Sequence, residues 1–196
     1  MPFVFKRLAL LMSIAAAFAA DKEAPFKAAP AASYVHRQTN DKITIGVDAY
    51  SSADKIKTAF GKLNPYQYGI LPVLVVIQND GEKTIRLDRL KAHYVGPNGD
   101  RVEATPAKEV KYLNGGKRPT TLPTPIGSVG LKKKNPLDAW EIEGRALAAQ
   151  MLPAGNAASG FLYFQTGLHS TATVYLSGLV EAGTDRELLY FEIPMR

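Results

Sequence analysis

Three histidines, His36, His93 and His169, have side chains that could bind a metal ion or act as a general base. Zinc sites usually take two ligands from positions a few residues apart, and none of these histidines has a second ligand at that spacing. The 196-residue chain contains no cysteine, which excludes thiolate ligands and a cysteine nucleophile. We therefore predict histidines at the surface or at strand ends, with no metal and no cofactor.

Hydrolysis and phosphate chemistry also lack their usual signatures. The chain has no Gly-x-Ser-x-Gly turn to hold a nucleophilic serine. Gly127 and Gly130 lack the preceding strand and following helix that a phosphate-binding loop needs. Glu141 and Glu143 are two residues apart, so on a helix they would not face the same cleft. We predict no catalytic residue, and the alternative is an enzyme whose site is assembled from separate loops.

Two neighbours of these glutamates have both a chemical and a structural interpretation. Arg145 follows Glu141 by four residues, which is the spacing of an ion pair on a helix surface. Trp140 could stack on a ligand, but it shares helical spacing with Leu137 and Leu147. The pattern favours a surface ion pair for Arg145 and a core position for Trp140.

The clearest chemical signal is positive charge in the middle of the chain. Residues 101–134 contain eight lysines and arginines but only two acidic residues, whereas the whole chain has 24 basic and 18 acidic residues. Five basic side chains of the loop 117–134 are the candidate contacts for an anionic partner: Lys117, Arg118, Lys132, Lys133 and Lys134. A solvated loop whose charge serves solubility is the alternative, and the sequence alone favours it. Residues 101–134 contain a single aromatic residue, Tyr112, so nucleic-acid binding by base stacking is not supported.

A scaffold must hold these residues, and the apolar run 70–77 predicts its centre. The run is rich in β-branched residues, contains Pro72 and ends at the turn signal Asp80-Gly81, all of which favour a buried strand over a helix. Residues 42–50 alternate between apolar and polar types and predict a half-buried strand. Ser51 and Ser52 then predict the N-terminus of a short amphipathic helix that ends near residue 63.

The rest of the chain predicts further strands and one more helix. Residues 85–94 alternate with a slip at Asp88-Arg89, where we predict a β-bulge. A turn at 97–99 should pair that strand with 101–105. Asn135-Pro136 predicts the start of a helix that runs through Trp140 to Leu147, although residues 140–143 would also suit a strand. Residues 160–165, 172–177 and 187–193 predict three closing strands.

Together these patterns predict a mainly β protein, a single antiparallel immunoglobulin-like β-sandwich with one or two short helices. Two segments carry a resemblance to the immunoglobulin-like domains of exported bacterial proteins. They are the Pro-Val-Leu-Val-Val-Ile-Gln-Asn strand at 72–79, and the Leu-Pro-Ala-Gly turn at 152–155 that runs into 160–164. The Cys and Trp framework of antibody domains is absent. The resemblance therefore implies a fold and no active site.

Residues 1–19 have the features of a secretory signal peptide. Lys6 and Arg7 precede an apolar stretch of about a dozen residues, and Ala17 and Ala19 predict cleavage after residue 19. A permanent membrane anchor is the alternative, but the stretch is shorter than the roughly 20 residues of a spanning helix. We predict a flexible lead-in at 20–33 and one β-sandwich domain at 34–196 with its basic loop at 117–134.

The expected function follows from location and from the missing catalytic signatures. We predict an exported, non-catalytic binding or interaction module of the cell envelope, periplasmic or extracellular, with no transmembrane segment after cleavage. Its partner would be an envelope protein or an anionic surface. A small exported enzyme and a purely structural envelope component are the two alternatives.

Overall fold

The structure is a computed structural model that describes residues 26–113, 135–188 and 190–195. The predicted signal peptide and the five basic contact residues of the loop 117–134 lie outside the described residues. Among the residues that are described, no helix is long and apolar enough to cross a membrane.

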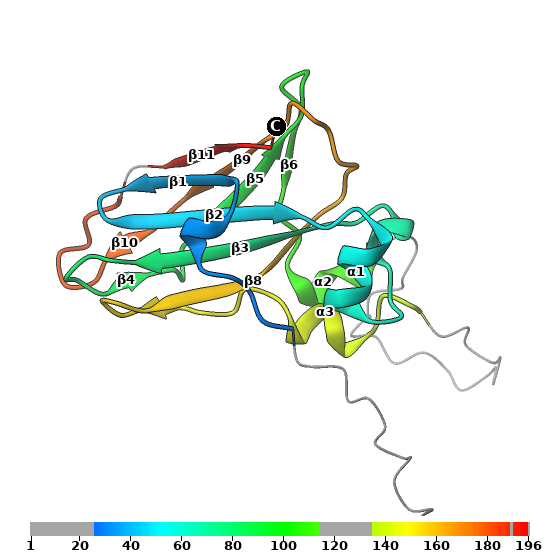
Figure 1. The fold of residues 1–196 in the computed structure, drawn as a ribbon, viewed down its shortest axis with the longest axis horizontal. Coiled ribbons are helices and arrows are strands. Elements are labelled where there is room, and N and C mark those ends of the chain that lie inside the picture. The colour runs from blue at the N-terminus through cyan, green and yellow to red at the C-terminus, as the bar shows by residue number, and fades with distance from the viewer. Residues whose placement is uncertain (1–25, 114–134, 189, 196) are drawn as a thin grey trace, which may run out of the picture.

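Two four-stranded sheets form the body of the protein (Figure 1). The first, here called the long sheet, has the order β1 (His36–Asn40), β2 (Ile43–Ala49), β3 (Leu71–Asn79) and β8 (Ala157–Phe164). The second, the facing sheet, has the order β11 (Phe191–Pro194), β9 (Thr173–Ser177), β5 (Lys91–Val95) and β6 (Arg101–Glu103). A small sheet contains β10 (Val180–Glu181), β4 (Ile85–Arg86) and β7 (Met151–Leu152). Neighbouring strands are antiparallel in all three sheets.

Strand β3 is buried on both faces, as its apolar run predicts. Val73 and Val75 belong to the core between the long and facing sheets, whereas Leu74 and Val76 belong to a second core on the other face of the long sheet. All four are at most 3% exposed. Strand β3 pairs with β2 on one side and with β8 on the other. The prediction of a central buried strand is confirmed.

Short helices cover the second core, and those at 53–68, 107–110 and 140–144 gather at one end of the molecule (Figure 1). They are η1 (Ala31–Ser33), α1 (Ala53–Phe60), η2 (Pro65–Tyr68), α2 (Ala107–Val110) and α3 (Trp140–Gly144). The Ser52 side chain caps α1 by accepting a hydrogen bond from the Lys55 amide, and Ile56 and Phe60 are its buried side chains. The prediction of an amphipathic helix after β2 is confirmed.

The predicted bulge at Asp88-Arg89 is wrong. Strands β4 and β5, on either side of that position, belong to different sheets. A turn connects them, in which the Leu90 amide donates to the Leu87 carbonyl over 3.0 Å. The alternation slips because the chain passes from the small sheet to the facing sheet. The predicted turn at 97–99 does join β5 to β6.

The predicted helix from Asn135 to Leu147 is also wrong in its extent. The Asn135 side chain accepts a hydrogen bond from the Leu137 amide in a separate turn, and α3 begins only at Trp140. After α3 the chain lies along β8, where the Arg145 carbonyl accepts from the Phe161 amide and the Leu147 amide donates to the Phe161 carbonyl. These bonds satisfy part of the backbone N–H and C=O groups at the free edge of β8. The helix ends early because the chain after it makes these bonds.

The mainly β class, with three antiparallel sheets and a few short helices, is confirmed. Strand β1 and its pairing with β2 are additions that the sequence analysis missed. Within the predicted lead-in, Ala31 is 1% exposed and belongs to the second core.

Candidate functional site

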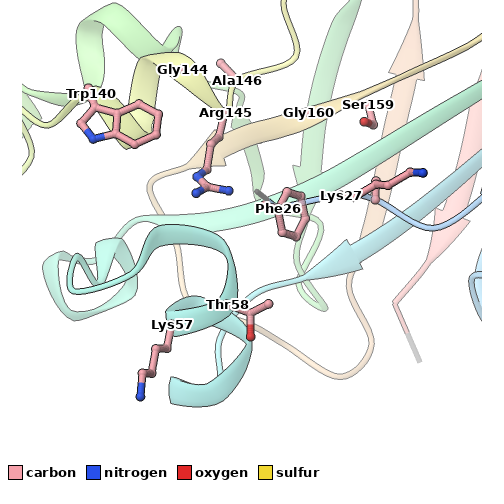
Figure 2. A pocket seen from close by; sticks show the side chains of 11 residues that line it. Phe26, Lys27, Lys57, Thr58, Trp140, Gly144, Arg145, Ala146, Ser159 and Gly160 are labelled. Atoms are coloured by element: carbon pink, nitrogen blue, oxygen red, sulfur yellow. The ribbon is translucent and has the colours of Figure 1, made fainter. Parts of the chain in front are cut away.

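A groove lies at the helical end of the molecule, where four separate segments meet (Figure 2). The N-terminal segment supplies Phe26 and Lys27, and α1 supplies Lys57 and Thr58. The segment from α3 to its exit supplies Trp140 and Arg145, and β8 supplies Ser159 and Gly160. Its cavity volume is about 1050 Å³. We call it the Arg145 groove.

Positive charge dominates the Arg145 groove. Lys27, Lys57 and Arg145 line it, and none of its described lining residues is acidic. Two carboxylates on neighbouring elements have basic partners of their own, because Asp48 pairs with Lys55 over 2.7 Å and Glu143 lies 3.5 Å from Lys111. The described lining of the groove is therefore cationic and attracts anions.

Arg145 lies between two aromatic rings. Its Cζ atom is 5.5 Å from the centroid of the Phe26 ring and 5.8 Å from that of Trp140, so the guanidinium makes cation–π contacts with both (Figure 2). Its Nε atom is buried and has no hydrogen-bond partner among the described residues. A guanidinium held in this way presents its remaining N–H groups to a planar oxyanion, which it can bind with two parallel hydrogen bonds.

Two glycines make this arrangement possible. A Cβ atom on Gly144 would lie 2.9 Å from the Trp140 ring, so a larger residue would displace that ring from its place across the end of α3. A Cβ atom on Gly160 would lie 2.4 Å from the backbone of Leu147. Glycine at 160 therefore lets the chain after Arg145 run directly against β8 and fixes where the guanidinium projects.

Aromatic packing holds Phe26 in place. Its ring centroid is 5.4 Å from that of Phe161 and 6.1 Å from that of Tyr50. Burial raises the pKa of Tyr50 to about 12, and nearby Asp48 adds to the shift. Burial also raises the pKa of Tyr163, whose hydroxyl donates to the Ile142 carbonyl. Both phenols stay neutral at physiological pH and add no negative charge beside the groove.

The structure corrects both predictions for the α3 region. Trp140 is 69% exposed and does not belong to the core. Arg145 forms no ion pair with Glu141, because the chain leaves the helix at Arg145 and directs the side chain toward Phe26. Sequence reasoning missed the Arg145 groove, since its residues come from segments far apart in the chain.

The described residues that flank the predicted basic loop contact each other beside α2 and α3. Asn135, at the first described position after the loop, donates from its side chain to the Lys111 carbonyl beside α2. Lys111 in turn lies 3.4 Å from Asp138, just before α3. The described residues on either side of the gap at 114–134 thus lie beside α2 and α3, and of these two helices α3 lines the groove.

The three histidines lie on separate elements. His36 is in β1, His93 is in β5, and His169 follows β8, where its backbone amide donates to the Tyr94 hydroxyl over 2.7 Å. Within residues 26–113, 135–188 and 190–195, no group of three or more His, Asp or Glu side chains is arranged to hold a metal ion.

Comparison with known proteins gives distant structural likenesses only. No protein-family model and no curated protein matches the chain. The X-ray structure of a Northeast Structural Genomics Consortium target has a TM-score of 0.34 and 10% identity, over 80% of this chain and 89% of that one. The crystal structure of a functionally unknown protein from Listeria monocytogenes has a TM-score of 0.33 and 12% identity, over 81% and 79% of the two chains.

Proposed function

We propose that this protein is an exported, non-catalytic binding module of the cell envelope and that the Arg145 groove binds an anionic group of its partner. The single observation that carries the proposal is Arg145 itself. Its guanidinium lies between two rings in a groove with two lysines, and no described residue forms an ion pair with it. A buried or half-buried cation without a counterion is costly unless a ligand supplies one.

The groove lining favours binding over catalysis. Its hydroxyls, on Thr58 and Ser159, have no histidine or carboxylate beside them among the described lining residues. A nucleophile without a base is weak at its normal pKa. The alternative of a small enzyme needs a base from another loop, and the alternative of a structural component needs no ligand at all.

Export and an immunoglobulin-like arrangement belong to the same proposal. The basic start, apolar stretch and small residues of 1–19 support export to the periplasm or the outside of the cell. Two facing antiparallel sheets around a common core are consistent with a sandwich. The lysines of the loop 117–134 would add a second, long-range attraction for the same anionic partner.

The test is a binding titration of the mature chain, residues 20–196, with poly-L-glutamate, polyphosphate and vesicles of anionic lipid as separate probes. The three probes distinguish carboxylates, free phosphates and lipid headgroups. Arg145→Gln should weaken binding of the preferred probe about tenfold or more, because one charge-assisted hydrogen bond contributes roughly 1.5–3 kcal/mol. Arg145→Lys should recover only part of the loss, since lysine binds as a point charge.

Lys42→Gln is the matched control. Lys42 belongs to the turn between β1 and β2, and its side chain is 68% exposed. That turn lies at the opposite end of the long sheet from α1 and α3 (Figure 1). The Lys42→Gln substitution removes one positive charge, as Arg145→Gln does, without changing a residue of the groove. Equal weakening of binding by Arg145→Gln and Lys42→Gln would attribute the effect to net charge and contradict the groove as the anion site. If none of the three probes binds, the proposal as a whole is contradicted.

A further inference from the structure

The outer face of the facing sheet carries exposed side chains and has its own chemistry. The inward side chains of β5 and β9, such as Tyr94, Val174 and Leu176, are buried in the core. Their neighbours along each strand point outward, since alternate residues of a strand face opposite sides. Strand register places four of these outward residues in one row across the four strands: Glu192, Tyr175, His93 and Glu103.

Two tyrosines form an aromatic platform on this face. The rings of Tyr175 and Tyr190 are stacked, with centroids 6.1 Å apart and an angle of 28° between their planes. Tyr190 is 57% exposed. The Arg101 guanidinium lies 6.0 Å from the centroid of Tyr175. A concavity of about 270 Å³ lies beside the rings and is also lined by His93 and Ser177. We call this surface the tyrosine face.

The charges around the platform are balanced. Arg101 and Lys91 are on the same face as Glu103 and Glu192, which gives two positive and two negative side chains. The Tyr175 hydroxyl donates a hydrogen bond to Glu192, and this bond raises the pKa of Tyr175. Unlike the Arg145 groove, the tyrosine face has no net charge that would select an anion or a cation.

We infer that the tyrosine face binds a neutral saccharide, with one sugar ring stacked on the exposed ring of Tyr190, which Tyr175 supports from beneath. The C–H bonds on one side of a sugar ring carry partial positive charge and suit the negative face of an aromatic ring. Its hydroxyls both donate and accept, which matches carboxylate, imidazole, guanidinium and hydroxyl groups around the platform.

The size of the concavity supports one ring. Pockets for drug-sized ligands have volumes of about 300–1,000 Å³, and this concavity lies just below that range. A flat protein partner would not need the hollow between His93, Ser177 and the rings. The inference concerns a different surface from the proposed anion site and does not depend on it.

The experiment is an NMR titration of the mature chain with maltose, cellobiose, lactose and N,N′-diacetylchitobiose, each at millimolar concentration. At least one disaccharide should shift the amide signals of β5, β9 and residues around Tyr190. Tyr190→Ala should reduce the affinity at least fivefold, because the exposed ring on which the sugar stacks is lost. Tyr175→Phe keeps a ring and should reduce the affinity less.

Two further variants keep the test specific. Trp140→Ala removes an exposed aromatic ring elsewhere and should leave saccharide affinity unchanged, and Arg145→Gln should do the same. Tyr190 is exposed, so Tyr190→Ala should leave the unfolding transition unchanged. If that variant is destabilised, the affinity of Tyr175→Phe provides the test instead. Absence of shifts with all four disaccharides, or full affinity in Tyr190→Ala, would overturn the inference and leave the face to a protein partner.

Discussion

The Arg145 groove and the tyrosine face are two recognition surfaces built in opposite ways. The groove combines four segments from distant parts of the chain, contains three cations and has no acidic residue among its described lining. The tyrosine face is made mainly by adjacent strands of one sheet, and its charges are balanced. The difference indicates that loops and helix ends create an electrostatic site here, whereas a regular sheet face creates a site of shape and stacking.

Both surfaces depend on the same core, so the largest effects should come from removing it. Val75→Ala or Ile77→Ala should lower the free energy of unfolding by about 2–4 kcal/mol, through lost transfer energy and a residual cavity. Both side chains are 0% exposed in the centre of β3. Urea denaturation measures the change.

The exposed residue Val35 provides the control for this measurement. It is 86% exposed, so Val35→Ala should change the free energy of unfolding by no more than about 0.5 kcal/mol. Urea midpoints that are the same for the buried and exposed variants would contradict the role of β3 as the central strand.

A substitution at Gly160 should separate the two surfaces. Gly160→Ala places a Cβ atom against the backbone of Leu147, and we expect a loss of about 1–3 kcal/mol from overpacking. Arg145 should shift with that backbone, so anion binding should weaken while saccharide binding is retained. Ser159→Ala is the neighbouring control and should fold normally. Loss of both binding activities in a folded Gly160→Ala protein would show that the surfaces are coupled.

Glu181 offers a test of paired against unpaired charge. Its carboxylate is nearly buried and accepts hydrogen bonds from Arg186, Lys83 and Thr184, which lower its pKa to about 2. A lowered folded-state pKa stabilises the fold above the unfolded value near 4.5, and this contribution is lost as the pH falls toward 2. Glu181→Gln should destabilise the protein at pH 7 and flatten the stability profile between pH 4.5 and 2.

Arg145 should behave differently in the same measurement. Because it has no ion pair among the described residues, Arg145→Gln should change stability much less than Glu181→Gln at pH 7. Thermal unfolding of both variants across the pH range gives the comparison. A larger loss in Arg145→Gln would indicate that this arginine serves the fold and not a ligand.

The smallest effect on stability is expected from the basic loop. Replacing Lys132, Lys133 and Lys134 by glutamine should leave thermal stability nearly unchanged but weaken retention on anionic vesicles. The attraction is screened over about 8–10 Å at physiological salt, so the difference from the wild type should be greatest at low salt. Equal retention of both proteins from low to physiological salt would assign the loop to solubility alone.

Local patterns predicted some elements well and missed others for identifiable reasons. The run at β3 was sufficient because burial on both faces imposes it residue by residue. The alternation at β2 predicted the strand correctly, but the prediction that it is half-buried is wrong, because Thr44 and Gly46 on its second face are buried too. Strand β1 was missed because its hairpin turn uses Asp41 and Lys42, with φ angles of 48° and 60°, where glycine is the usual signal. The slip at 88–89 was misread since a change of sheet and a bulge produce the same pattern.

The sequence by itself determined the class of the fold, the central strand, the capped helix α1 and the absence of cysteine chemistry, because each depends on neighbouring residues or on composition. Only the tertiary structure decided that Trp140 is exposed, that Arg145 lies between Trp140 and Phe26, and that Tyr175 stacks on Tyr190. These contacts join residues whose spacing in the sequence follows neither helical nor strand periodicity. They arise where chain segments cross, which composition and periodicity do not encode.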